Sequence, residues 1–138
     1  MFRRIVVPSD LTDRNRPAAE MAAKLVTSDG KVHLVHVIET IVGFSVEEER
    51  EFYDRLEHAA AQHLMGLGAP LRERGTAVEA KVVYGARAKT VIEEADGIGA
   101  DLIVIQSHRV EGGRREEGFG TLSYQIAIFA RCPVLLVK

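Results

Sequence analysis

The 138-residue chain has no tryptophan, a single cysteine and no long apolar run. Because Cys132 is the only cysteine, no internal disulfide can form, which fits a reducing compartment. No apolar stretch approaches the roughly 20 residues of a membrane-spanning helix. The run that ends at Pro8 is also too short for the core of a signal peptide. We therefore expect a cytoplasmic protein without a membrane anchor.

An excess of charge of either sign is also lacking. Lys and Arg number 18 and Asp and Glu number 20, so the formal net charge is −2. This balance does not indicate a nucleic-acid-binding surface. The hydrophobic fraction of 46% is ordinary for a globular protein and argues against disorder. The length fits one domain that spans residues 1–138.

Short apolar runs alternate with stretches of helical spacing along the whole chain. The runs predict strands at 5–8, 32–38, 78–84, 102–105 and 134–137, and the intervening stretches predict four helices. Apolar residues on both faces of 32–38 are typical of a parallel sheet between two helical layers. We predict an α/β fold with an open five-stranded parallel sheet of order 3-2-1-4-5 and helices on both faces.

Local patterns predict where two of these helices begin and end. Thr12 or Asp13 is expected to cap the first helix, and 28–30 (Ser-Asp-Gly) to end it. Ser45 and Glu48 have the spacing of a capping box before the long second helix. Pro70 is expected to bend or divide that helix.

Two loops are candidates for a ligand site, because the carboxyl ends of strands one and four meet where the strand order reverses. The first loop is 8–12 (PSDLT), and the second is 106–120. The second loop ends in Gly118-Phe119-Gly120-Thr121, whose small residues would let backbone N–H groups approach an anion. The alternative is a loop without a ligand, in which Thr121 caps the following helix.

Five segments resemble the universal stress protein family, and they occur in the family's order. They are 5–12 (IVVPSDLT), 35–38 (VHVI), 83–85 (VYG), 100–108 (ADLIVIQSH) and 131–137 (RCPVLLV). The resemblance covers nearly the whole chain. It implies a Rossmann-like fold similar to the adenine nucleotide alpha hydrolases, a stress-associated role and a homodimer through the last strand.

The resemblance also implies a nucleotide site for ATP or AMP. Asp10 would take the ribose hydroxyls, Pro8 and Val37 would lie near the base, and Ile105 would line the base pocket. Gly120 and Thr121 would meet the phosphates.

The family's phosphate motif is only half present. The motif is Gly, two residues, Gly, nine residues, Gly, then Ser or Thr; here Gln106 and Arg109 replace the first two glycines. Ten residues, in place of nine, precede Gly120. A side chain at either replaced position can block the approach of phosphate to the backbone, although Arg109 can bind phosphate through its guanidinium. We expect weak or absent ATP binding.

Two function classes fit these residues. The first is a binding or signalling module without turnover, for which we assign no catalytic residue and no metal ligand. The second is a slow ATP or nucleotide hydrolase, but no Walker sequence is present. A receiver domain would need an Asp after strand three, where Tyr84 and Gly85 stand.

The last strand, 134–137, is apolar and would lie at a sheet edge. An exposed apolar edge pairs readily with a second chain, and a two-fold axis makes that pairing antiparallel. We expect a homodimer; the alternative is a monomer whose edge is shielded by Lys138 or by the long second connection.

Overall fold

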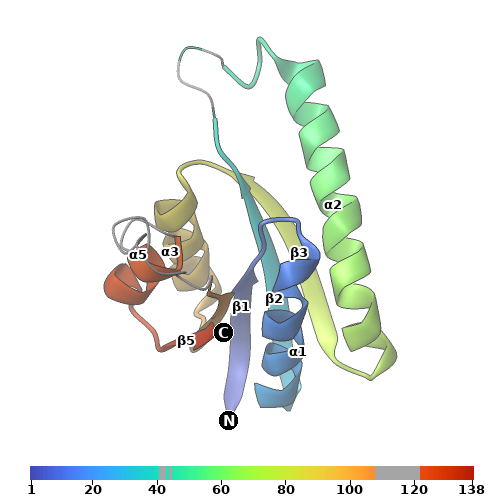
Figure 1. The fold of residues 1–138 in the computed structure, drawn as a ribbon, viewed down its shortest axis with the longest axis vertical. Helices are drawn as coiled ribbons and strands as arrows, with labels where there is room; N and C mark the ends of the chain where they lie inside the picture. The colour runs from blue at the N-terminus through green and yellow to red at the C-terminus, as the bar shows by residue number, and fades with distance from the viewer. Residues whose placement is uncertain (41–42, 44, 108–121) are drawn as a thin grey trace.

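A computed structural model gives the fold, and it describes residues 1–40, 43, 45–107 and 122–138. Figure 1 shows a sheet with helices on its two faces. The strands are β1 (Phe2–Pro8), β2 (Val26–Ile38), β3 (Ala77–Tyr84), β4 (Leu102–Gln106) and β5 (Val134–Val137). The helices are η1 (Asp13–Asn15), α1 (Arg16–Leu25), α2 (Arg50–Glu73), α3 (Arg87–Ile98) and α5 (Leu122–Phe129).

The strand order is β3-β2-β1-β4-β5, and every neighbouring pair is parallel. This confirms the predicted fold class and the predicted order. β1 lies at the centre and pairs with β2 on one side and β4 on the other. The carboxyl ends of β1 and β4 are therefore adjacent at the point where the connections diverge, which is the usual ligand position in such sheets.

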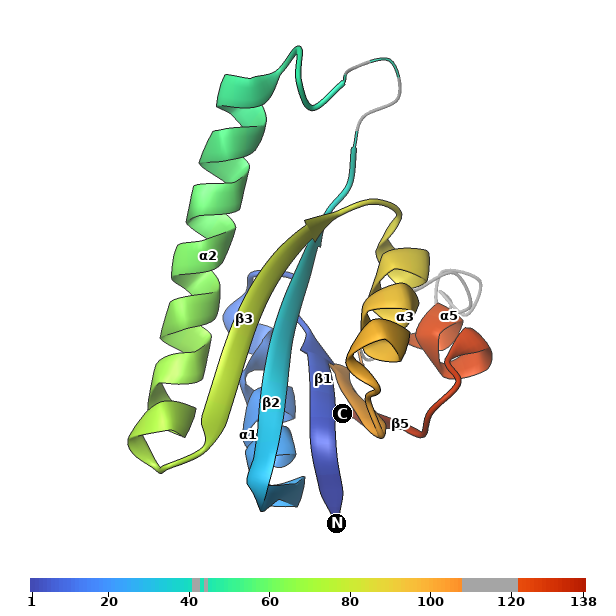
Figure 2. The ribbon, with the colours of Figure 1, turned by 180° about the vertical axis from the view of Figure 1, so that it is seen from behind.

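The core has two apolar layers, one on each face of the sheet, because successive side chains of a strand point to opposite faces. In β1, Ile5 and Val7 pack in one layer while Val6 packs in the other. Figures 1 and 2 show α1 and α2 on one face and α3 and α5 on the other. The layer under α1 and α2 includes Val32, Leu34, Leu102 and Val104, and the layer under α3 and α5 includes Val35, Val37, Ile103 and Ile105.

The predicted helix stop at residues 28–30 is wrong. Helix α1 ends at Leu25, and the following residues already belong to β2. Val26 and Thr27 are β-branched and favour extended backbone. The register between β1 and β2 shifts here, and a Cβ on Gly30 would lie 2.7 Å from the carbonyl oxygen of Arg3. Gly30 therefore permits a close approach between two strands and does not end a helix.

The predicted cap of α1 by Thr12 or Asp13 is also wrong. A short 3-10 turn precedes α1, and neither Thr12 nor Asn15 makes a side-chain cap hydrogen bond. The backbone N–H of Ala18 instead donates to Oε1 of Gln106 at 3.2 Å. A side chain from β4 thus satisfies one of the free N–H groups of the first helical turn.

Helix α2 is continuous through Pro70, so the proline does not divide it. Buried Leu67 and Leu71 hold the helix on both sides of that residue, and this packing outweighs the proline cost of roughly 3 kcal/mol. The Oγ of Ser45 accepts the N–H of Glu48 at 3.0 Å, as one half of the capping box requires.

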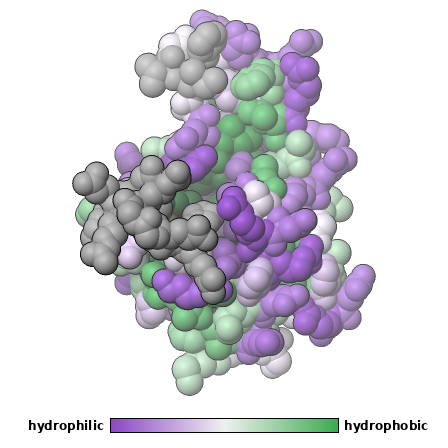
Figure 3. Space-filling view, in the orientation of Figure 1, coloured by the Kyte–Doolittle hydropathy of each residue, from purple (hydrophilic) through white to green (hydrophobic). Residues whose placement is uncertain are grey.

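The amino-terminal half of α2 projects past the carboxyl edge of the sheet (Figure 1). Figure 3 shows apolar surface alongside this half, and its Phe52 and Leu56 are 40% and 39% exposed. The hydroxyl of Tyr84, at the end of β3, donates to Glu57 at 2.7 Å. Desolvation and this hydrogen bond raise the pKa of Tyr84 to about 12, so the phenol stays a donor at neutral pH. Among the helices of the described ranges, none is long and apolar enough to cross a membrane.

Candidate functional site

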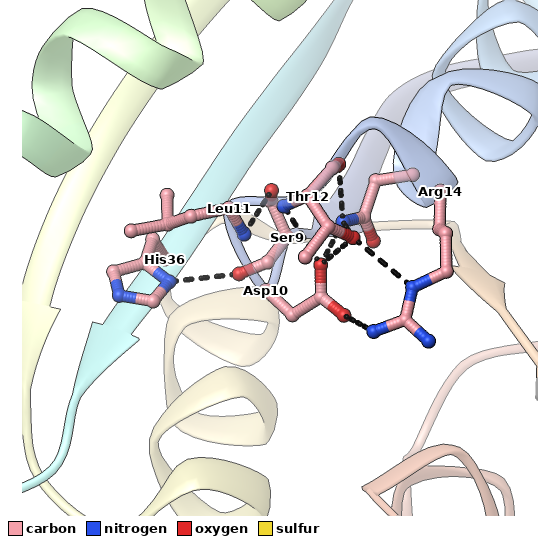
Figure 4. A network of polar contacts seen from close by, with 7 residues as sticks. Ser9, Asp10, Leu11, Thr12, Arg14 and His36 are labelled. Atoms are coloured by element: carbon pink, nitrogen blue, oxygen red, sulfur yellow. Dashed lines mark hydrogen bonds and ion pairs between the residues drawn. The ribbon is translucent and has the colours of Figure 1, made fainter.

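The loop after β1 is fixed to β2 by two hydrogen bonds, and Figure 4 shows the one made by His36 together with the polar contacts within the loop. The N–H of Ser9 donates to the carbonyl of Val35 at 2.8 Å. The Nδ1–H of His36 donates to the carbonyl of Ser9, also at 2.8 Å. Leu11 has a φ of 65°, a left-handed conformation that is unfavourable for a side chain of this size. Strain of this kind, of order 1–3 kcal/mol, is concentrated at functional loops.

The Asp10 carboxylate organises this loop through one of its two oxygens. Its Oδ1 accepts the backbone N–H of Thr12 at 3.0 Å, the hydroxyl of Thr12 at 2.6 Å and the side-chain amide of Asn15. Its Oδ2 lies 3.6 Å from the guanidinium of Arg14. Asp10 therefore shapes the turn with Oδ1, while Oδ2 has only a long contact to Arg14 among the described residues.

The Asp10 carboxyl is ionised at neutral pH. Burial alone would raise its pKa, but the hydrogen bonds from Thr12 and Asn15 and the charge of Arg14 outweigh burial and lower the pKa below its ordinary value. The side chain of Asp10 is 35% exposed. The site thus presents a charged acceptor that can take hydroxyl or amino donors from a ligand.

A small cavity of about 60 Å³ lies at the carboxyl ends of β1 and β2. Three of the residues predicted from the sequence, Pro8, Asp10 and Val37, line it together. His36 and Arg87 line it as well, and neither was among the predicted binding residues. The sequence gives little signal for Arg87, because it stands after β3 and enters the site only through the position of α3.

The other predicted site residues are divided between the core and the undescribed segment. Ile105 is 4% exposed and packs in the same buried layer as Val37 and Val91. The described lining of the cavity does not include Ile105. Arg109, Gly120 and Thr121 lie outside the described residues. Leu122, the first described residue after them, lines the cavity.

A wider groove of about 740 Å³ lies between α3 and α5. Arg87 and Leu122 line both this groove and the small cavity. Three cations of the groove each lie near an acid: Arg87 near Glu39, Lys89 near Glu93, and Arg131 near Asp96, at 3.7, 3.9 and 3.7 Å. No group of three or more His, Cys, Asp or Glu side chains within the described ranges is placed to hold a metal ion.

Known proteins were compared with the chain as a whole. The model of the universal stress protein family matches residues 1–138. The chain belongs to the universal stress protein family. Universal stress protein MJ0531 of Methanocaldococcus jannaschii is 27% identical over 142 residues, which cover 100% of this chain and 83% of that protein. Universal stress protein G of Shigella flexneri is 26% identical over 144 residues, which cover 100% of this chain and 100% of that protein.

Solved structures of the family share the fold. Hypothetical protein MJ0577 superposes with a TM-score of 0.83 at 26% identity, covering 100% of this chain and 96% of that one. A universal stress protein in complex with cAMP superposes with a TM-score of 0.79 at 21% identity, covering 99% of this chain and 97% of that one. A universal stress protein family protein of Arabidopsis thaliana with AMP bound superposes with a TM-score of 0.69 at 24% identity, covering 99% of this chain and 91% of that one. For the cAMP and AMP complexes, at 21% and 24% identity, the likeness to this chain establishes the fold alone.

Gln106 occupies the position of the first glycine in the universal stress protein phosphate motif. Its side chain makes hydrogen bonds to α1 and to β5. Its Oε1 accepts the N–H of Ala18 at 3.2 Å, and its Nε2 donates to the carbonyl of Val137 at 3.1 Å. Gln106 therefore joins α1, β4 and β5.

Proposed function

We propose that this universal stress protein is a small stress-response-associated binding or signalling protein that holds an adenine nucleotide weakly at the β1/β4 switch point. The observation that carries the proposal is that Pro8, Asp10 and Val37 line one cavity at the carboxyl ends of β1 and β2. Two structural neighbours, solved with cAMP and with AMP, support an adenine nucleotide as the ligand class.

In the proposed complex, Oδ2 of Asp10 accepts the ribose hydroxyls, because Oδ1 is already occupied by Thr12 and Asn15. The base lies against Pro8 and Val37. Ile105 supports the pocket from below, and Arg109, Gly120 and Thr121 meet the phosphates of AMP or ATP.

We expect this binding to be weak. Only Gly120 and Thr121 match the phosphate motif, so fewer backbone N–H groups can approach an anion closely than in a complete glycine loop. The described cavity of about 60 Å³ is also far below the roughly 300 Å³ of ordinary ligand pockets. We predict a dissociation constant for ATP with magnesium weaker than about 1 μM.

Mass spectrometry of the protein, purified without denaturation and then denatured, identifies the ligand directly. An adenine nucleotide in the released fraction supports the proposal, and so does its recovery after incubation with AMP followed by rapid desalting. Because a weakly bound nucleotide can dissociate during purification, the refuting result is no measurable binding of AMP or ATP in a calorimetric titration at high nucleotide concentration. Conversion of added ATP to ADP or AMP by the protein would instead support the slow hydrolase that the sequence leaves open.

We further propose that the protein is a homodimer that pairs through β5, and that it works in the cytoplasm. β5 is the last strand of the sheet, and none of the described strands pairs with its outer side, which leaves that edge for a second chain. The adjoining helix α5 carries Ile128 and Phe129, which are 67% and 68% exposed in the single chain. An edge strand beside exposed apolar residues favours a self-complementary interface. The single cysteine supports a reducing compartment.

A further inference from the structure

A short turn connects the end of β3 to the start of α3 (Figure 2). The N–H of Gly85 donates to the carbonyl of Ile38 at 3.1 Å, which ties this turn to the end of β2. Gly85 has a φ of 151°, and a Cβ there would collide with Oγ1 of Thr90. Arg87 is the first residue of α3 after this turn. Its backbone is therefore fixed beside the ends of β2 and β3.

The Arg87 side chain borders two hollows. It lines both the strand-end cavity and the larger groove between α3 and α5. The side chain is 61% exposed, and its ion pair with Glu39 is long, at 3.7 Å, and equally open to solvent. An exposed pair of this length holds a side chain weakly. A shift of Arg87 would thus enlarge the small cavity toward the groove, and the guanidinium would then lie against the entering ligand.

The strand order indicates which part of a nucleotide Arg87 meets. β3 lies beyond β2 on one side of β1, whereas β4 lies on the other side. If the ribose is on Asp10 and the phosphates are near the β4–α5 connection, the base points toward the ends of β2 and β3. Val37 and Arg87 stand there. A guanidinium donates hydrogen bonds and stacks on aromatic faces, and a purine offers the larger ring face and an acceptor at N7.

We propose that Arg87 is a specificity-determining residue that contacts the base and favours purine over pyrimidine nucleotides. This inference rests on the proposed function, since it requires a nucleotide in the site. It goes beyond the proposed contacts by adding a residue and a ligand preference.

Titration of the full-length protein with ATP and with CTP, each with magnesium, tests this inference. The wild type is expected to bind ATP more tightly than CTP. Arg87→Ala should weaken ATP binding about tenfold, the size of one partly exposed cation–π or charge-assisted contact, and should bring the two affinities close together. Arg131→Ala is the matched control, because Arg131 also has a 3.7 Å ion pair and lines only the groove; it should change neither affinity.

Three results would overturn the role of Arg87 while leaving nucleotide binding intact. The first is equal affinity of the wild type for ATP and CTP, and the second is unchanged affinity in Arg87→Ala. The third is an equal loss of affinity for ATP and CTP in Arg87→Ala, which would place the guanidinium on the phosphates. Failure of the wild type to bind either nucleotide would refute the proposed function itself. The two failures are therefore distinguishable.

Discussion

At the residue scale, Asp10 shapes the turn after β1, and we propose that it also binds the ligand through its second carboxylate oxygen. Oδ1 accepts hydrogen bonds from Thr12 and Asn15 and so shapes the turn that follows β1. Oδ2 has Arg14 as its nearest described partner, at 3.6 Å. This structural role and the proposed binding role are compatible, because one carboxylate can accept from several donors at once.

The lowered pKa of Asp10 predicts an acid-sensitive contribution to stability. The pKa of this carboxyl in the folded state lies below its ordinary value of 3.8. Ionised Asp10 therefore stabilises the fold above that value, and this contribution is lost as the pH falls through the lowered pKa. Urea unfolding of Asp10→Asn between about pH 7 and pH 3 should show a shallower decline than the wild type.

A second variant, Thr12→Val, keeps the carboxyl group but removes one of its donors. Its decline with acid should fall between those of the wild type and Asp10→Asn. Identical pH dependence in all three proteins would show that the hydrogen bonds of this loop do not perturb Asp10.

At the scale of elements, Gln106 joins three parts of the fold that are far apart in the sequence. The oxygen of its side-chain amide accepts a hydrogen bond from the N–H of Ala18 in α1, and the nitrogen donates one to the carbonyl of Val137 in β5. Loss of both hydrogen bonds in Gln106→Ala should lower the free energy of unfolding by about 2 kcal/mol. Gln62→Ala, an exposed change in α2, is the control and should stay within about 0.5 kcal/mol of the wild type. Urea unfolding measures both, and equal stability of the two variants would argue against the tether.

The strands could be predicted from the sequence because apolar patterning reports burial directly. Their order could be predicted because strands alternate with helices and two candidate loops must converge after strands one and four. The beginning and end of α1 could not, because each depends on distant residues. Gln106 supplies the cap of α1 from β4, and Gly30 is required where β2 passes close to Arg3 of β1. A similar limit applies to the site. Pro8, Asp10 and Val37 are expected because of the family resemblance, whereas Arg87 enters through the packing of α3.

At the scale of the whole molecule, the proposed dimer explains why the β5 edge and α5 leave apolar groups uncovered. Val134→Lys and Leu136→Lys each place a charge in the proposed interface, so each should shift the protein from dimer toward monomer. Light scattering should give twice the chain mass of 15.2 kDa for the wild type at tens of micromolar. Ala77→Lys, on the opposite edge strand β3, is the control and should stay dimeric. A monomeric wild type, or a dimer that tolerates both substitutions, would contradict the proposed interface.

Calorimetric titration with ATP and magnesium, carried out on the wild type and on Asp10→Ala, tests the central claim most directly. We predict weak binding to the wild type, with a dissociation constant above about 1 μM. Asp10→Ala should weaken it by about tenfold, since a hydrogen bond to a charged group contributes roughly 1.5–3 kcal/mol. Asp29→Ala is the matched control, because Asp29 also pairs with an arginine, Arg3, at 3.0 Å but lies at the amino end of the sheet. Equal affinity of Asp10→Ala and the wild type, or no binding to either, would contradict a nucleotide site built on Asp10.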